Sequence, residues 1–180
     1  KNKEMVAIQI QKNKGRDYVS PTQEDKKLYQ DAIKYFDSKK QEFKKEGLIP
    51  MEDIHASHRR ENTLWHYGIK QWDEYFDKRQ TLVPCTYLKN IKEICNNIKD
   101  VKYRSAIAFY LTAILAKRID MSGFGVVWDS TRETPSNILS LRRPSFVSNF
   151  AESNPFEKSR GSLPNIMNNI VKGISFANRL

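Results

Sequence analysis

The feature that most constrains the fold is an uncharged, largely apolar stretch near the middle of the chain, residues 106–116. Asp100 stands before it at the position of a helix N-cap, and Lys117 and Arg118 follow it, where the helix dipole favours cations. The stretch is apolar almost all round a helix, which is typical of a helix buried on every side. We therefore predict a helix over residues 101–119, at the centre of the domain.

A second helix is predicted over residues 24–46. Its apolar positions recur with helical spacing, Gly47 has the place of a C-cap glycine, and Pro50 prevents the helix from restarting. Seven lysines and six acidic residues nearly cancel along it. This balance favours a solvated face crossed by ion pairs.

Two more helices have clear N-terminal signals. Asp77 is followed three residues later by Gln80, which is the spacing of a capping box, and Ser162 has the position of an N-cap before the last amphipathic segment. Pro84 falls inside the helix that Asp77 begins, so we expect a kink or a break near Leu82.

The remaining segments are short or irregular. Residues 5–11 and 17–19 read as the strands of a hairpin joined by a turn at residues 12–15, and residues 51–66 as a loop with short turns. Residues 121–163 contain repeated glycine and proline and no sustained period. The expected fold is mainly α (α+β): a β-hairpin in residues 1–22 that ends a preceding module, then a helical domain over residues 23–180 with the irregular segment before its last helix. Since the chain begins with Lys1, we expect a piece of a longer protein.

Composition limits the partners. The 31 Lys and Arg residues exceed the 21 Asp and Glu residues, which gives a net charge of +10 and favours a polyanion, with nucleic acid preferred over a membrane surface. No signal peptide and no apolar run of about 18 residues is seen, so a cytoplasmic protein is expected. Cys85 and Cys95 match no metal or redox spacing and are predicted to be buried free thiols.

Catalytic motifs are absent from the sequence. It has no phosphate-binding loop and no nucleophile elbow. The histidines at positions 55, 58 and 66 lack the spacing and the additional ligands of a metal site, so no metal is expected. By itself the chain does not resemble an enzyme.

Several basic residues lie beside aromatic residues, which is the pattern of phosphate contacts next to stacking surfaces for bases. The same pattern also arises where an amphipathic helix meets water. The candidate DNA contacts are Arg59, Arg60, Lys78, Arg79, Arg142 and Arg143. The candidate base-stacking or pocket residues are Trp72, Phe146, Phe150, Asn154 and Phe156.

The sequence Asn154-Pro155-Phe156 was compared with the catalytic loop of amino-methyltransferases, Asn/Asp-Pro-Pro-Tyr/Phe. One proline is missing here and no clear apolar strand leads into the segment. A plain turn, in which Asn154 precedes Pro155, is therefore predicted.

A family resemblance follows from short spaced motifs over most of the chain. The motifs are Arg16-Asp17-Tyr18, Pro21-Thr22, Gly47-Leu48-Ile49-Pro50, Tyr67-Gly68-Ile69, Trp72, Phe76, Arg79-Gln80, Trp128, Asn149-Phe150-Ala151-Glu152-Ser153-Asn154-Pro155-Phe156 and Gly161-Ser162. Together they resemble the large prokaryotic adenine-specific DNA methylases.

The resemblance implies a role without chemistry of its own. In that family the S-adenosylmethionine loop lies upstream and the Asp-Pro-Pro-Tyr catalytic loop lies downstream, and neither is present here. The chain would then be the helical region between them, with no cofactor in this segment and S-adenosylmethionine in the parent protein. The implied partners are DNA and the remainder of the methyltransferase chain.

Two alternatives are left open. A helical protein–protein interaction module of a restriction or phage-defence complex would bind a partner protein in place of DNA. An RNA-binding module is less favoured, because the aromatic strand and glycine-loop signatures of common RNA-binding folds are missing.

Overall fold

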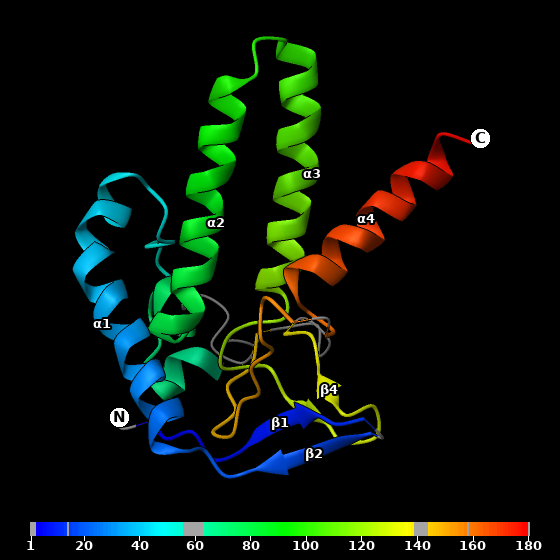
Figure 1. Ribbon diagram of the computed structural model, residues 1–180. Helices are drawn as coiled ribbons and strands as arrows, with labels where there is room; N and C mark the ends of the chain where they lie inside the picture. Colours follow the sequence, from blue (N-terminus) through cyan, green and yellow to red (C-terminus); the bar gives the residue numbers. More distant parts are fainter. Residues whose placement is uncertain (1–2, 14, 56–62, 139–143, 158, 180) are drawn as a thin grey trace.

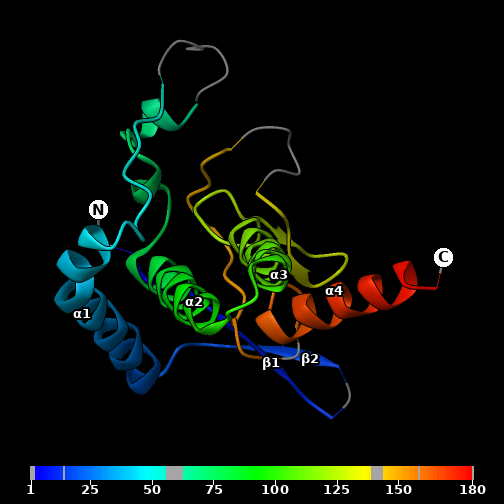
Figure 2. The same ribbon diagram turned by 90° about the horizontal axis from the view of Figure 1, so that it is seen from above.

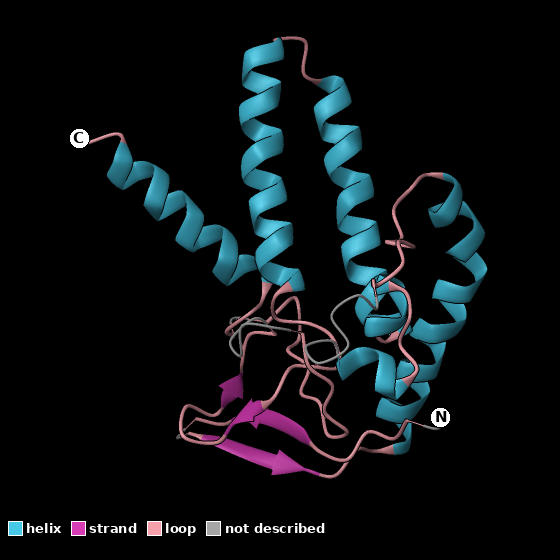
Figure 3. Ribbon diagram, turned by 180° about the vertical axis from the view of Figure 1, so that it is seen from behind, coloured by secondary structure: helices cyan, strands magenta, loops and turns pink. Residues whose placement is uncertain are grey.

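The computed structural model describes residues 3–13, 15–55, 63–138, 144–157 and 159–179. Within these residues the fold is mainly α, with a short antiparallel hairpin near the N-terminus and helices after it, as the sequence predicts (Figure 1). The irregular segment lies below the helices, beside the hairpin (Figure 3).

The hairpin consists of β1 (Ile8–Gln11) and β2 (Arg16–Val19), with Ile8 opposite Val19. It contacts a second small ribbon formed by β3 (Trp128–Asp129) and β4 (Thr134–Pro135). The Arg16 guanidinium donates a 2.7 Å hydrogen bond to the carbonyl of Glu133. The Tyr18 and Trp128 rings meet edge to face. The predicted hairpin is confirmed, and its contacts connect it to the irregular segment.

Helix α1 (Gln23–Lys45) begins at Thr22, whose side chain forms a capping box with Asp25. Gly47 has a φ of +65°, which is the left-handed conformation that ends many helices. The exposed face is crossed by ion pairs, as predicted. Glu42 accepts from both Lys39 and Lys89, and these two ammonium groups lower its pKa to about 2.

Helix α2 (Lys78–Asn97) begins at the predicted capping box of Asp77 and Gln80. Of the kink or break expected near Leu82, the break is not observed, because the helix continues through Pro84. Proline removes one backbone hydrogen bond from a helix. Here Cys85, the residue that follows, is buried in the core between α1 and α2, and this packing holds the helix together on either side of the proline.

Helix α3 (Val101–Ile119) has the predicted N-cap, since Asp100 accepts a 2.8 Å hydrogen bond from the Tyr103 amide. Its predicted burial on every side is wrong. Helices α2 and α3 form a hairpin that projects from the rest of the protein (Figures 1 and 3), and Phe109 is 67% exposed. Apolar composition predicts a buried helix only where a second layer covers it, and in the described structure α2 covers one side of α3.

Helix α4 (Leu163–Ala177) begins at the predicted N-cap Ser162. It contacts the C-terminal end of α3 and then diverges from it (Figures 1 and 2). Ile166 is its one buried residue, while Met167, Val171 and Phe176 are exposed. Its apolar face is therefore mostly uncovered.

Two core clusters support the fold. The first lies between α1 and α2 and contains Phe36, Phe43, Leu48, Ile49 and Cys85. Cys85 is buried as predicted, whereas Cys95 is only half-buried; both thiols are free.

The second cluster joins two 3₁₀ helices, η2 (Thr63–Tyr67) and η3 (Trp72–Tyr75), to the irregular segment. Its buried residues include Tyr75, Phe124 and Val126. The irregular segment, whose sequence has no helical or strand period, thus contributes residues to the core. None of the described helices combines the length and the apolar character that crossing a membrane requires.

Candidate functional site

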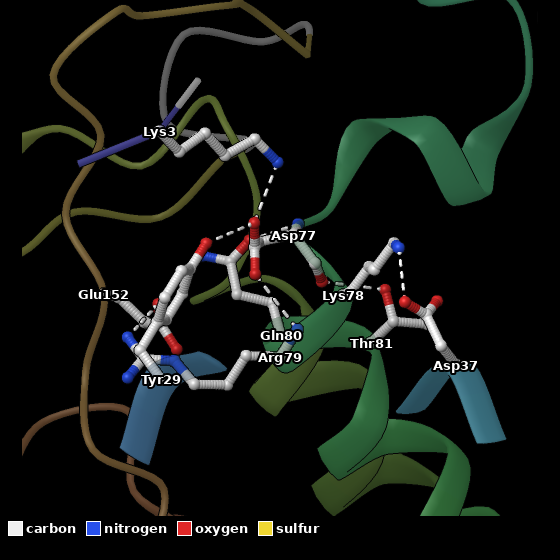
Figure 4. Close-up of polar contacts among 9 residues, drawn as sticks. All are labelled: Lys3, Tyr29, Asp37, Asp77, Lys78, Arg79, Gln80, Thr81 and Glu152. Atoms are coloured by element: carbon white, nitrogen blue, oxygen red, sulfur yellow. Dashed lines mark hydrogen bonds and ion pairs between the residues drawn. The ribbon is translucent and has the colours of Figure 1, made fainter. Parts of the chain in front are cut away.

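Four of the six predicted DNA contacts, Arg59, Arg60, Arg142 and Arg143, lie outside the described residues. The other two, Lys78 and Arg79, each form an ion pair with a carboxylate of the same chain. Lys78 forms a 2.7 Å ion pair with Asp37, and Arg79 forms a 2.9 Å ion pair with Glu152 (Figure 4). Arg79 therefore contributes to internal packing, since its guanidinium also lies over the Tyr29 ring at 4.9 Å.

Asp77 is the centre of a polar cluster at the start of α2 (Figure 4). Its carboxylate is 3% exposed and accepts hydrogen bonds from the Lys3 ammonium at 2.8 Å, the Tyr29 hydroxyl at 2.9 Å and the Arg79 amide at 3.0 Å. One N-cap residue thus holds the N-terminal segment and α1 against α2. The cluster is an anchor for three parts of the chain.

The electrostatics of this cluster keep Asp77 charged. Burial by itself would raise the pKa of Asp77, but the hydrogen bonds from Lys3 and from the Arg79 amide outweigh it, so the pKa lies below its ordinary value. Burial raises the pKa of Tyr29 well above its ordinary value, and the neighbouring carboxylate of Asp77 adds to this effect. Tyr29 is therefore a constant hydrogen-bond donor to Asp77.

A second polar centre is Arg118, which is 1% exposed at the C-terminal end of α3. It donates to the Ser153 hydroxyl at 2.7 Å, to the Ser153 carbonyl at 3.1 Å and to the Gly161 carbonyl at 3.1 Å. Burial lowers the pKa of Arg118, and the charge of Glu152 opposes that shift. One side chain therefore fixes both ends of a loop formed by residues 153–157 and 159–161, named here the Arg118 loop.

The two ends of the Arg118 loop, Ser153 and Gly161, lie in close contact with each other. Gly161 has a φ of +84°, and a Cβ atom at this position would lie 2.9 Å from the Ser153 hydroxyl oxygen. Glu152 precedes the loop and is held by Arg79 of α2. The loop is thus attached to α3 through Arg118 and to α2 through Glu152.

The tip of the Arg118 loop presents an aromatic ring to solvent. The Asn154 side-chain oxygen accepts a 3.0 Å hydrogen bond from the Phe156 amide, which confirms the predicted turn as an Asx turn. The Pro155 carbonyl accepts a 2.8 Å hydrogen bond from the Leu163 amide at the start of α4. With its backbone held in this way, Phe156 is 73% exposed.

The other predicted stacking residues pack within the protein. Phe146 stacks on Tyr67 with ring centroids 4.4 Å apart, and Phe150 meets Phe124 edge to face at 5.0 Å. Trp72 is half-buried against the same core. The structure therefore brings Asn154 and Phe156 together at an exposed surface and places Trp72, Phe146 and Phe150 against the second core cluster.

Sequence reasoning missed the residues that hold this site. Arg118 was assigned to the helix dipole, and the roles of Glu152 and Ser153 were not foreseen. The one available signal was an arginine that continues a strongly apolar helix. Such a residue needs internal partners if it is buried. Arg160, beside the second anchor of the loop, is exposed and donates to the Asn137 side chain at 3.3 Å.

Within the described ranges, no three His, Cys, Asp or Glu side chains are arranged to hold a metal ion. Comparison of the chain with protein-family models, with curated proteins and with solved structures finds no match.

Proposed function

We propose that the chain is a non-catalytic DNA-recognition or scaffold region of an S-adenosylmethionine-dependent DNA adenine-N6 methyltransferase. The proposal starts from the family resemblance of the sequence. The observation that carries it is the Arg118 loop, which presents the exposed Phe156 on a backbone fixed at both ends. In this proposal S-adenosylmethionine binds to other parts of the enzyme, and the chain supplies contacts to the substrate.

The Phe156 ring would bind DNA by stacking on a base. A methyltransferase that acts on a base must take that base out of the duplex, and the displaced bases need apolar surfaces on which to stack. An aromatic ring on a backbone that is already ordered loses less conformational entropy on binding than one on a free loop. Arg160 and the excess of basic residues would contact phosphates.

The test is binding of a labelled duplex containing one unpaired adenine, measured by fluorescence anisotropy across a salt series. The account predicts that affinity falls steeply with salt. Phe156→Ala should weaken binding by about 1–3 kcal/mol, which is about fivefold or more in Kd, because one stacking contact is lost.

Phe109→Ala is the matched control, since Phe109 has a similar exposure but lies on α3, away from the loop. If Phe156→Ala and Phe109→Ala bind this DNA equally well, the loop has no role in recognition. If the chain does not bind DNA at low salt, the scaffold role alone is left.

A second candidate function is favoured by a different observation. The apolar faces of α3 and α4 are uncovered, with Val101, Phe109, Met167, Val171 and Phe176 all more than half exposed. Exposed apolar surface on helices is typical of a protein-binding site. This favours a helical protein–protein interaction module, as in a restriction or phage-defence complex.

A further inference from the structure

One side of α3 is a shallow, open apolar groove lined by residues of that helix alone. The residues that line it recur at helical spacing, so they form a single stripe along the helix. The stripe lies on the opposite side of α3 from the buried residues Ile114 and Arg118. The lining residues, named here the α3 groove, are Ser105, Ala108, Phe109, Thr112, Ala113 and Ala116.

The shape of the α3 groove suits another helix. Five of its six residues are small, and small side chains let a second backbone approach closely. Phe109 is the one large residue, and its exposed ring offers an apolar ridge beside the stripe. Ridges and grooves of this kind are how two helices pack against each other.

The charge around the groove selects the partner. Neither α3 nor α4 contains an acidic residue, whereas the basic residues Lys102, Arg104 and Lys172 lie on these helices; Lys117 is paired with Asp120 and adds no net charge. The acids at the two ends of α3 are engaged, since Asp100 caps the helix and Asp120 accepts from Lys117 at 2.8 Å. The groove is therefore an apolar surface in a basic field.

We propose that the α3 groove binds an acidic amphipathic helix of a partner protein, lying lengthwise along α3. The inference rests on the second candidate function and is independent of the proposed DNA contact. A second copy of this chain is disfavoured as the occupant, because it would bring like charges together. Helix-in-groove binding uses apolar anchors for affinity and the flanking charges for selection.

The test uses two synthetic fluorescent peptides with the same leucine face, one with glutamates and one with lysines on its polar face. At about 0.15 M salt the full chain should bind the glutamate peptide at least about tenfold more tightly than the lysine peptide. Equal affinity for the two peptides, or no binding of either, would overturn the proposal.

Variants locate the binding site. Thr112→Glu places a charge in the α3 groove and should weaken binding of the glutamate peptide by about tenfold or more, and Phe109→Ala should also weaken it. Asn90→Glu, on the exposed side of α2, makes the same charge change outside the groove and should alter affinity less than about twofold. Circular dichroism checks that each variant folds. Peptide binding that is unaffected by Thr112→Glu would place the site elsewhere.

Two controls separate this proposal from others. Phe156→Ala should leave peptide binding unchanged, so a failure of the DNA proposal does not affect this result. Vesicles of phosphatidylserine and phosphatidylcholine test a membrane surface. If the vesicles bind the chain through residues sensitive to Thr112→Glu and the glutamate peptide does not bind, a lipid surface replaces the protein partner and the proposal fails.

Discussion

The two sides of α3 are in opposite environments. On one side Arg118 is buried and fixes a loop through three hydrogen bonds, whereas Phe109, on the opposite side about two and a half turns earlier, is exposed. The first environment holds polar groups in one arrangement, because a buried donor or acceptor without a partner is costly. The second leaves apolar surface available. One helix can therefore stabilise the fold on one side and offer a binding surface on the other.

The largest expected effect is at Arg118. Arg118→Met removes the guanidinium and leaves the buried oxygens of Ser153 and Gly161 without a donor, which should lower the free energy of unfolding by about 3–5 kcal/mol. Urea denaturation measures the change. Lys102→Met, on the exposed part of the same helix, is the control and should cost less than about 0.5 kcal/mol. Similar costs for both variants would remove the contrast between the two sides of α3.

The next effect is at Asp77. Asp77→Ala removes the N-cap of α2 and the acceptor for Lys3 and Tyr29, and it should lower the free energy of unfolding by about 2–3 kcal/mol. Thr22→Ala is the comparison, since this N-cap is exposed at the start of α1, and it should cost about 1 kcal/mol. Thermal or urea unfolding gives both values.

The pH dependence of stability follows from the same carboxylate. The pKa of Asp77 is lower in the folded protein than in the unfolded chain, so the unfolded chain takes up the proton first. Its contribution is fully present above the ordinary aspartate pKa and is lost as the pH falls through the folded-state pKa. Asp77→Asn should flatten this acid limb of the stability curve. An unchanged slope below about pH 4 would contradict the assignment.

A smaller effect is expected at Gly125, where a Cβ atom would overlap the Tyr75 hydroxyl and the Ser145 carbonyl oxygen. This hydroxyl donates to the Ser145 carbonyl at 2.7 Å and is buried, which raises the pKa of Tyr75 to about 12. Gly125→Ala should cost about 1–3 kcal/mol through overpacking. Combined with Tyr75→Phe, which removes the nearer of the two overlapping oxygens, it should cost less than the sum of the two single changes. If the stability costs of the two single changes simply add, the protein relieves the overlap in another way.

The smallest effect is expected on the projecting part of α3. Phe109→Ser should change the free energy of unfolding by less than about 0.5 kcal/mol, since the ring is already exposed. Phe36→Ala is the contrast, because that ring is buried between α1 and α2 and its loss should cost about 3–5 kcal/mol. A large loss of stability for Phe109→Ser would mean that its edge-to-face contact with the Tyr110 ring stabilises the fold.

Local signals in the sequence were sufficient for much of the fold. The caps at Asp77, Asp100 and Ser162 depend on residues two or three positions away, so their spacing predicts them. The continuity of α2 through Pro84 could not be predicted, because the packing that keeps this helix unbroken comes from α1, far away in the sequence. The exposure of α3 was also missed, since an apolar pattern does not reveal how many layers cover a helix.

The candidate site was less predictable. Arg118 and Ser153 are 35 residues apart, and no periodicity links them. Arg79 and Glu152 are 73 residues apart, so a basic residue that resembled a phosphate contact proved to have an internal partner. Phe156 was identified as a candidate because of its motif. Its distinction from Phe146 and Phe150 depends on burial, which only the tertiary structure gives.

The most direct test of the central claim is hydrogen exchange of the chain with and without a duplex that contains one unpaired adenine. Exchange reports the local opening of each backbone amide. The account predicts that DNA slows exchange in the Arg118 loop and at the Leu163 amide, and leaves α3 before residue 114 unchanged. Slower exchange along the α3 groove, with none in the loop, would contradict the assignment of DNA recognition to Phe156.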